Sequence, residues 1–550
     1  MTGFIYDVLK DLDLASRDTS KLTLILPNKR AGLFLKRDWS SISKATGFLP
    51  DIISIEHFIE ELSQLRLLSN TELIFEFYSV YLDLTPLNER DSFDSFSKWA
   101  PIVLQDFNEI DRYLIPQEQI FEYLTAIQEL NHWSLEANST PLVKGYLSFW
   151  KKVDSYYSKF TSHLLQKGAG YQGLIYREAV ENLELYTKNN PLKSHVFLGF
   201  NALNASESTI IQELLEQDKA VIYWDIDQTF IETPFHDAGY FIRQHQKQWS
   251  HFKKQPFKWV SNQYATPKNI SIVGTPKNIG QVKYVGSLLQ RLYSENKLQS
   301  TALILGNEDL LIPILNSIPS AIEDINITMG LPLKQIPFSA FINQWFQLQK
   351  ETNTHYYYQD IIGVLSHQFV RPLLQSTNED AAQKIITRLN THNSVSLTKD
   401  QIIAIAPTHK PILELLFTNW NNQPAKAIQS VLELIFKLKD YYGKSKKNHL
   451  LPLEYLFRFS EIFNQLKELN NSYSYITTIK VLQSLFKELL STEMLDFKGQ
   501  PLKGLQIMGM LESRVLDFET GTRDGFVLGE GASDRRRFLE ITHKRRLSWR

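Results

Sequence analysis

Three polar residues stand directly after the first apolar run of the chain, where they could bind a phosphate group. The run 22–26 predicts a β-strand, and Asn28, Lys29 and Arg30 follow it at the start of a predicted helix that contains Arg37. A strand that delivers polar groups to the start of a helix is the usual way in which an open α/β sheet meets an anionic ligand at its carboxyl edge. The alternative interpretation is an ordinary turn with solvated basic side chains.

Two glycine-containing segments look like nucleotide-binding loops but lack essential parts. Gly443-Lys444-Ser445 has no glycine five residues earlier and follows a helix-like stretch rather than a strand. The segment 274–280 has Gln281 where such a loop carries lysine, and its Pro276 removes one of the amide donors. We therefore predict a chain without ATP hydrolysis. An NTPase with an unrecognised loop remains as an alternative, which turnover above the buffer background would revive.

Two groups of acidic residues could suggest a metal, but neither is complete. Asp225 and Asp227 follow a predicted strand at 220–224 and have no third ligand nearby in the sequence. Asp496 and Lys498 form an isolated Asp-x-Lys. No Pro-Asp stands a short way upstream to complete a metal-binding nuclease motif. We predict no metal site, no cofactor and no catalytic residue in this chain.

Composition limits the architecture that must position these residues. The chain has 550 residues, 43% of them hydrophobic and 12% aromatic, which is enough for three or four domains or subdomains. It has no cysteine, no apolar run of transmembrane length and no signal-peptide pattern, so we expect a cytoplasmic protein without membrane contact. The formal net charge is −1, so a nucleic-acid partner would have to meet local basic patches.

Periodicity predicts sheet segments separated by long helical segments. A capping box at Ser69 and Glu72 and another at Thr398 and Gln401 predict helix starts. The other predictions are helices near 93–113, 117–130, 142–168, 204 onwards and 282–293, strands near 195–200, 220–224, 270–274 and 301–306, and a second helical region up to about 497. The aromatics of the first helical region are at helical spacing, which favours a core over base-stacking platforms: Trp99, Phe107, Trp133, Phe149, Trp150, Tyr156 and Tyr157.

Several stretches resemble motifs of superfamily-1 helicases, and they occur in helicase order. PNKRAGLFLKR at 27–37 resembles motif Ia, WDIDQT at 224–229 resembles motif III, and GLQIMGMLESRVLDFE at 504–519 resembles motif V. Together with NITMGLPLK at 326–334, these stretches resemble AddB-like, PD-(D/E)xK nuclease family proteins of Bacteroidetes type. The resemblance spans about residues 1–519.

The resemblance implies an α/β fold with two RecA-like (P-loop NTPase-like) parallel-sheet domains, each with a large all-helical insertion. The implied boundaries are 1–60 and 169–268 for the first domain, 61–168 for its insertion, 269–345 and 501–520 for the second domain, 346–500 for its insertion, and 521–550 for a basic tail.

The resemblance also assigns roles to individual residues. It implies contact with the backbone of single-stranded DNA, without sequence preference, for six residues: Asn28, Lys29, Arg30, Arg37, Thr328 and Arg514. The magnesium-binding and water-orienting acids of motif II are replaced by Leu198 and Gly199, and Asp225 and Gln228 occupy motif III positions. A structural role is the alternative for each residue. Arg37 could pair with a helix carboxylate, and Arg514 could cap a strand–helix junction.

The tail departs from the family pattern. Residues 521–550 contain seven arginines, whereas residues 1–520 contain thirteen. We interpret this jump as a frameshift near Thr520 that removes the nuclease domain, which would leave the second sheet with an uncovered edge. A continuation in another reading frame would support this hypothesis. A basic tail that binds nucleic acid is the alternative.

These observations lead to one main hypothesis and one rival. The main hypothesis is an ATPase-inactive, DNA-binding subunit of an AddAB/RecBCD-type helicase–nuclease complex in double-strand-break repair and recombination, with an AddA-like helicase subunit as its partner. The rival is a protein–protein scaffold that makes only incidental DNA contacts through its aromatic-rich helical regions. Charge reversal at Lys29 and Arg30 would abolish DNA binding under the first hypothesis and spare partner binding under the second.

Overall fold

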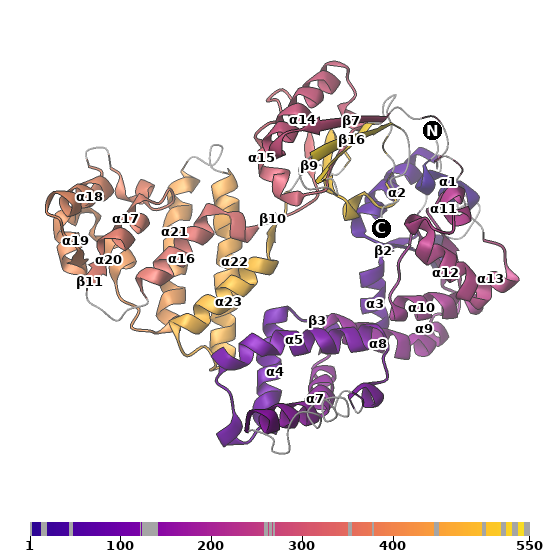
Figure 1. Ribbon diagram of the computed structural model, residues 1–550, viewed down its shortest axis with the longest axis horizontal. Helices are drawn as coiled ribbons and strands as arrows, with labels where there is room; N and C mark the ends of the chain where they lie inside the picture. The colour runs from indigo at the N-terminus through magenta and orange to yellow at the C-terminus, as the bar shows by residue number, and fades with distance from the viewer. Residues whose placement is uncertain are drawn as a thin grey trace. The chain divides into compact units, whose positions relative to one another are not determined.

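The protein is α/β and predominantly helical, as the computed structural model shows (Figure 1). The structure describes residues 3–12, 19–42, 48–121, 123, 141–257, 262, 264, 267, 270–349, 355–376, 379–444, 450–497, 502–516, 518, 524–530 and 537–543. The greater part of the predicted helix 117–130 (residue 122 and residues 124–130) therefore lies outside the described residues, as do Trp133, Lys498 and most of the tail arginines.

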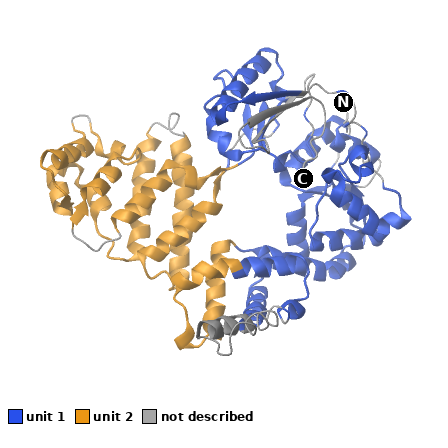
Figure 2. Cartoon of the chain, viewed as in Figure 1, with its two compact units in different colours: residues 1–68, 103–329, 496–550 blue, residues 69–102, 330–495 orange. Residues whose placement is uncertain are grey.

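The chain forms two compact units, which Figure 2 colours separately. Unit 1 consists of residues 1–68, 103–329 and 496–550, and unit 2 consists of residues 69–102 and 330–495. The boundary between them falls within α5 (Phe93–Arg112). Each unit thus combines segments that are distant in the sequence.

Unit 1 contains a parallel sheet of four strands in the order β2-β1-β5-β6. The strands are β1 (Leu22–Leu26), β2 (Asp51–Ser54), β5 (Ser194–Leu198) and β6 (Ala220–Tyr223). Alternate residues of the sheet face two different cores, as the period of two in a strand requires. The helices of this part are α1 (Phe4–Asp11), α2 (Lys29–Ile42), α3 (Ile55–Ser63), α7 (Pro141–Gln166), α8 (Gln172–Glu181), α9 (Leu183–Asn189), α10 (Ala205–Glu216), α11 (Gln228–Glu232), α12 (Tyr240–Gln248) and α13 (Ser250–Lys254). Two short strands, β3 (Arg66–Leu67) and β4 (Ala169–Gly170), pair with each other.

A second sheet in unit 1 has six strands in the order β7-β16-β15-β8-β14-β9. The strands are β7 (Ile270–Thr275), β8 (Ala302–Leu305), β9 (Ile325–Ile327), β14 (Leu505–Gly509), β15 (Asp524–Glu530) and β16 (Arg537–His543). One face is covered by α14 (Lys277–Ser294) and α15 (Leu311–Leu315). The other face contributes Ala302, Ile304 and Met508 to the core that also holds residues of β1 and β5. The two sheets of unit 1 therefore share one hydrophobic core.

The second sheet differs from the expectation in two respects. It is mixed rather than parallel, because β16 pairs antiparallel with both β15 and β7. The prediction that the sheet has an uncovered edge is also wrong. Strand β15 pairs with β8 over Gly525–Leu528, so residues of the basic tail continue the sheet. The basic composition of the tail gave no sign of these strands, because strand pairing is decided by partners far away in the sequence.

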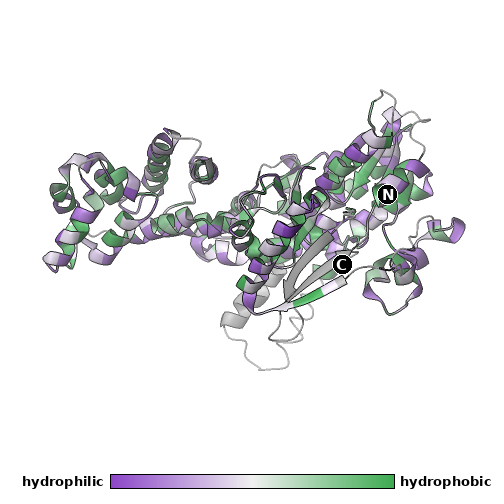
Figure 3. Cartoon of the chain, turned by 90° about the horizontal axis from the view of Figure 1, so that it is seen from above, coloured by the Kyte–Doolittle hydropathy of each residue, from purple (hydrophilic) through white to green (hydrophobic). Residues whose placement is uncertain are grey.

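The described residues of unit 2 are mainly helical and form two small strand pairs, β10 (Leu331–Pro332) with β13 (Met494–Leu495) and β11 (His355–Tyr357) with β12 (Ser396–Thr398). Hydrophobic and hydrophilic residues alternate along its helices (Figure 3), as expected for helices with one buried face. The helices are α4 (Asn70–Leu84), α16 (Pro337–Leu348), α17 (Tyr358–Ser366), α18 (Ala381–Thr391), α19 (Lys399–Ile405), α20 (Lys410–Phe417), α21 (Pro424–Gly443), α22 (Leu450–Ser472) and α23 (Ile479–Thr492).

The local predictions about helix starts are confirmed. Both predicted capping boxes form, at Ser69–Glu72 and Thr398–Gln401, and Asn204 makes a third with Glu207 at the start of α10. The aromatic residues Phe107, Tyr156 and Tyr157 are buried, as a core assignment requires, while Trp99 is half-buried. The side chains of Phe149 and Trp150 lie outside the described part of the chain.

Candidate nucleic-acid interface

The turn between β1 and α2 is held by its own first polar residue. Asn28 accepts a hydrogen bond on Oδ1 from the backbone N–H of Ala31 at 2.8 Å. This is the usual bond of a helix N-cap, which satisfies one of the amide groups that the first turn leaves without a partner. Asn28 therefore fixes where α2 begins, immediately after the carboxyl end of β1.

Two of the predicted phosphate-binding cations lie on the exposed side of α2. Lys29 is exposed, and within the described residues no hydrogen bond or ion pair holds its ammonium group. Arg37 is exposed as well, but its Nε lies 2.8 Å from Asp38 Oδ1, and its guanidinium lies 4.8 Å from the ring centre of Phe34. The predicted pairing of Arg37 with a helix carboxylate is thus confirmed. An exposed pair of this kind is weak, so the guanidinium can exchange Asp38 for a phosphate.

Arg30 points the other way, into the protein. Its Nη2 donates a hydrogen bond of 2.7 Å to Oε1 of Gln506 in β14. Burial lowers the pKa of Arg30 to about 10, while the carboxylate of Glu512 acts in the opposite direction. Arg30 is therefore charged at neutral pH and ties the start of α2 to the second sheet.

Thr328 belongs to the same group of contacts. Its hydroxyl donates to Oε2 of Glu512 at 3.2 Å and to the carbonyl of Ile507 at 3.3 Å. Asn326, just before it in β9, donates to the same Gln506 oxygen that Arg30 uses, at 2.7 Å. We call Arg30, Asn326, Thr328, Gln506 and Glu512 the polar joint.

The polar joint connects the start of α2, which follows β1, to β9 and β14 of the second sheet. The Glu512 carboxylate also accepts from the amide of Gly509 at 2.5 Å, which closes the turn after β14. Nη2 of Arg30 and the Thr328 hydroxyl thus donate inside the protein, whereas the buried Nε of Arg30 has no hydrogen-bond partner among the described residues. The joint positions the exposed cations of α2 and orients the two sheets.

The position of the motif II acids is closed by direct packing. Leu198 ends β5 and is buried in the shared core. Gly199 has a φ of +71°, and a Cβ at this position would lie 2.3 Å from Cγ2 of Val515. A carboxylate side chain at residue 199 would therefore collide with the turn after β14. The sequence has no acid at residues 198 and 199, and the structure shows that Val515 occupies the space beside residue 199.

The motif III-like acids serve the local backbone. Asp227 accepts from the amide of Thr229 at 3.0 Å as the N-cap of α11, and its other oxygen accepts from the amide of Tyr264 at 2.9 Å. Gln228 forms a hydrogen bond with Glu232 one helical turn later, and Asp225 is half-buried. Across the described part of the chain, no group of three His, Asp or Glu side chains is arranged to hold a metal ion.

Arg514 is half-buried in the turn that follows the 3-10 helix Leu511–Ser513. Among the described residues, no hydrogen bond or ion pair fixes its guanidinium, so the cap suggested by the sequence does not form. The neighbouring Val515, with a φ of +67°, packs against Gly199. Arg514 therefore lies near the closed motif II position with its charge available to a ligand.

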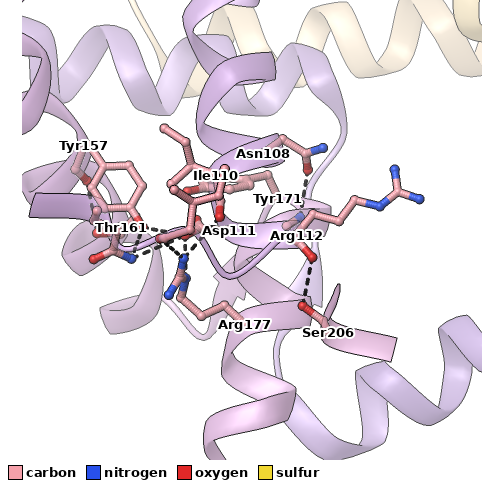
Figure 4. Close-up of polar contacts among 12 residues, drawn as sticks. Asn108, Ile110, Asp111, Arg112, Tyr157, Thr161, Tyr171, Arg177 and Ser206 are labelled. Carbon is pink, nitrogen blue, oxygen red and sulfur yellow. Dashed lines mark hydrogen bonds and ion pairs between the residues drawn. The ribbon is translucent and has the colours of Figure 1, made fainter. Parts of the chain in front are cut away.

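A second buried polar cluster surrounds Asp111 and has the residue types of an acid–base site (Figure 4). Asp111 is fully buried in α5 and accepts hydrogen bonds from Arg177 Nε at 2.7 Å, from the Tyr157 hydroxyl at 2.5 Å and from the Tyr171 hydroxyl. Burial and the Asp111 charge raise the pKa of both tyrosines. Arg177, Tyr157 and Tyr171 are all hydrogen-bonded to Asp111. The cluster therefore fastens α7 and α8 to α5 rather than presenting a reactive group.

Gln506 and Glu512 were not predicted as site residues from the sequence. Gln506 is the polar exception in the fully buried strand Leu505–Gly509, and a polar residue in such a strand requires a hydrogen-bond partner. That signal was available in the sequence. The identity of the partner was not, because Arg30 is 476 residues away.

Comparison of the chain with models of known protein families, and with curated proteins, finds no match. Within the described residues, no helix combines the length and the apolar character that crossing a bilayer requires.

Proposed function

We propose that this chain is an ATPase-inactive, helicase-like subunit that binds single-stranded DNA in an AddAB/RecBCD-type helicase–nuclease complex of the cytoplasm. On this proposal the two sheets of unit 1 are RecA-like domains, and the AddB-like resemblance reflects common descent. The chain would bind a helicase motor subunit that supplies ATP hydrolysis. Its own part is to hold DNA during double-strand-break repair and recombination.

The observation that carries the proposal is the start of α2 at the carboxyl edge of β1. The polar joint uses Arg30 and Thr328 to fix this turn, and Asn28 caps the helix. Lys29 and Arg37 remain on the exposed side. Cations on a fixed helix start can neutralise phosphates without reading bases, so binding would be independent of sequence.

The absence of hydrolysis has a separate basis. Hydrolysis of this kind requires a magnesium carboxylate and a water-orienting acid to act together. Leu198 and Gly199 supply neither, and Val515 fills the space that a side chain at residue 199 would need. Arg514, next to Val515, is free to add a third phosphate contact at this edge.

The proposal is tested by titrating a labelled single-stranded oligonucleotide at two salt concentrations. We expect wild-type binding to weaken steeply with salt, and K29E/R37E to lower the slope of log K against log salt by about 1.4, since each lost phosphate contact contributes about 0.7. K426E/K487E is the matched control, because Lys426 and Lys487 are exposed in unit 2. Failure of the wild type to bind at low salt would refute the proposal.

The scaffold alternative is favoured by one specific observation. A cavity of about 590 Å³ opens between α21 and α22 of unit 2, and it is lined by the exposed rings of Phe436 and Phe457. If the chain serves only to hold a motor subunit, F436S/F457S will weaken that association and K29E/R37E will leave it unchanged. Under the DNA-binding proposal, K29E/R37E impairs oligonucleotide binding and F436S/F457S does not.

A further inference from the structure

One stretch of the chain has a charge distribution unlike the rest. Residues 238–294 contain no Asp or Glu, although the whole chain has 60 acidic residues among 550. The stretch contains nine basic residues: Arg243, Lys247, Lys253, Lys254, Lys258, Lys268, Lys277, Lys283 and Arg291. In a chain of net charge −1, an acid-free segment of this kind is one place where a local positive field can develop.

The first part of the acid-free segment forms α12 and α13, which rest on an aromatic base. Trp224 and Trp249 are both buried, with ring centres 5.7 Å apart, and Phe252 of α13 stacks on Trp249 at 5.8 Å. His245 stacks on Trp224 at 5.4 Å and bonds through Nε2 to the carbonyl of Asn201 at 3.0 Å. These contacts fix the inner side of both helices to the core of the first sheet.

Three lysines lie on the outer side of these helices. Lys247, Lys253 and Lys254 are exposed, and no hydrogen bond or ion pair among the described residues engages them. We call them the lysine patch. The two other basic groups of α12 are used internally: Arg243 donates to the carbonyls of Pro234 and His236 at 3.0 and 2.8 Å, and burial lowers the pKa of His245, so that it is neutral at pH 7.

No carboxylate among the described residues pairs with the lysine patch, although exposed acids lie on the elements that pack against its two helices. Beside α12 these are Glu232 of α11 and Asp237 of the 3-10 helix Asp237–Gly239. Helix α10, which packs against α13, carries the exposed Glu213 and Glu216. Burial and the repulsion of Glu216 and Glu184 raise the pKa of Glu213, and no lysine acts on it. The patch therefore keeps its charge. The described cations further along the acid-free segment lie on α14 of the second sheet and are spaced around that helix.

We propose that Lys247, Lys253 and Lys254 form a second phosphate-binding surface, which holds the sugar-phosphate backbone of a nucleic acid without reading its sequence. The inference rests on the proposed function and extends it from the start of α2 to α12 and α13. Lysine is a point charge without the planar fork of arginine, which suits phosphate contact better than base recognition. A membrane surface is the poorer partner, because an amphipathic helix that binds lipid needs a continuous exposed apolar face. Along α12 and α13, Ile242, Trp249 and Phe252 pack on the core, and the exposed ring of Tyr240 alone does not form such a face.

The test compares three forms of the full-length chain by titration with a labelled thymidine oligonucleotide at about 50 and about 200 mM salt. The patch variant is K247E/K253E/K254E. The matched control is K426E/K467E/K487E, which changes the net charge equally at exposed lysines of unit 2. We expect the patch variant to lower the slope of log K against log salt by about 2 and the affinity at the lower salt by about tenfold or more. We expect the control to match the wild type, and K247Q/K253Q/K254Q to show a smaller loss in the same direction.

The possible results separate the two proposals. If the wild type does not bind the oligonucleotide, the proposed function fails and the inference fails with it. If the wild type binds and the patch variant behaves like the control, the inference is overturned while the proposed function stands. Vesicles containing phosphatidylserine provide a further arm, and a patch variant that loses vesicle binding but keeps oligonucleotide binding would also overturn the inference.

Discussion

Replacing Gln506 with leucine should separate the two sheets of unit 1 more effectively than removing the charge that it binds. The Gln506 side chain is buried, and its Oε1 accepts two hydrogen bonds of 2.7 Å, from Arg30 and from Asn326. Its amide group donates to the carbonyls of Lys503 and Gly504, both at 3.2 Å. Leucine has nearly the same volume but leaves all four of these groups without their partner.

The expected magnitude follows from which groups are left unsatisfied. A buried donor that loses its partner costs about 1–3 kcal/mol, so the Arg30 and Asn326 donors together predict a loss of about 2–4 kcal/mol once the packing of leucine is allowed for. Arg30→Met should cost less than Q506L. Gln506 keeps its hydrogen bond from Asn326, and the variant removes a charged group that burial had desolvated. We expect R30M to change the free energy of unfolding by less than about 1 kcal/mol.

Hydrogen–deuterium exchange of peptides that cover residues 502–516 measures this local stability. A loss of about 2.8 kcal/mol corresponds to exchange about a hundredfold faster. Peptides from α21 in unit 2 serve as the internal control and should exchange at the wild-type rate in both variants. Equal exchange in Q506L and R30M would refute the reasoning, because it would mean that the two hydrogen bonds to Gln506 do not hold β14 in place.

Three further predictions concern other parts of unit 1. Asp111→Ala should cost about 3–5 kcal/mol in urea unfolding because it removes the carboxylate that balances the largely buried charge of Arg177, whose guanidinium then keeps only its bonds to the carbonyls of Ile110 and Ile115. D111L/R177M should recover most of that loss, and a double variant no better than D111A would contradict this. Gly199→Ala should lower the thermal midpoint, at a cost of about 1–3 kcal/mol, because the added Cβ would collide with Val515. Adding Val515→Ala should restore part of the lost stability. An unchanged midpoint in G199A would disprove the contact. His245 should make stability depend on pH: because burial lowers its pKa in the folded state, its contribution is complete above about pH 6.5 and is lost as the pH falls through the lower folded value. Urea midpoints measured from pH 7.5 to pH 5 should therefore fall less in H245Q than in the wild type, and parallel curves would exclude the effect.

Features that depend on neighbouring residues were predictable from the sequence. The capping boxes at Ser69 and Thr398 form because donor and acceptor lie within one helical turn. The strand 22–26 and the polar turn after it are also where the sequence pattern put them, and Arg37 finds its carboxylate in the next residue, Asp38. Local hydrogen bonds and periodicity carry this information without reference to the rest of the fold.

Features that depend on distant partners were not predictable in the same way. The residue type of Arg30 and its place after the first strand fit an exposed phosphate-binding residue. Its guanidinium nevertheless points inward, because it donates a hydrogen bond to the buried Gln506. The strands β15 and β16 occupy a stretch whose arginine content indicated a tail, since β8 and β7 offer them hydrogen-bonding edges. The lysine patch was predictable only in part. The sequence shows that residues 238–294 contain no Asp or Glu, but the packing of Trp249 is needed to show which side of the helices is exposed.

The long separation between Arg30 and Gln506 has a consequence for how the protein is made. Its first sheet leaves the ribosome early, but the core beneath that sheet is shared with Ile304, Met508 and Val515 and remains incomplete until β14 is translated. At typical rates of synthesis, a separation of 476 residues corresponds to a delay of roughly half a minute to a minute and a half. During that interval the apolar side of β1 and β5 is covered only by α1 and α2, and the part left exposed makes the nascent chain a natural client for chaperones that bind at the ribosome.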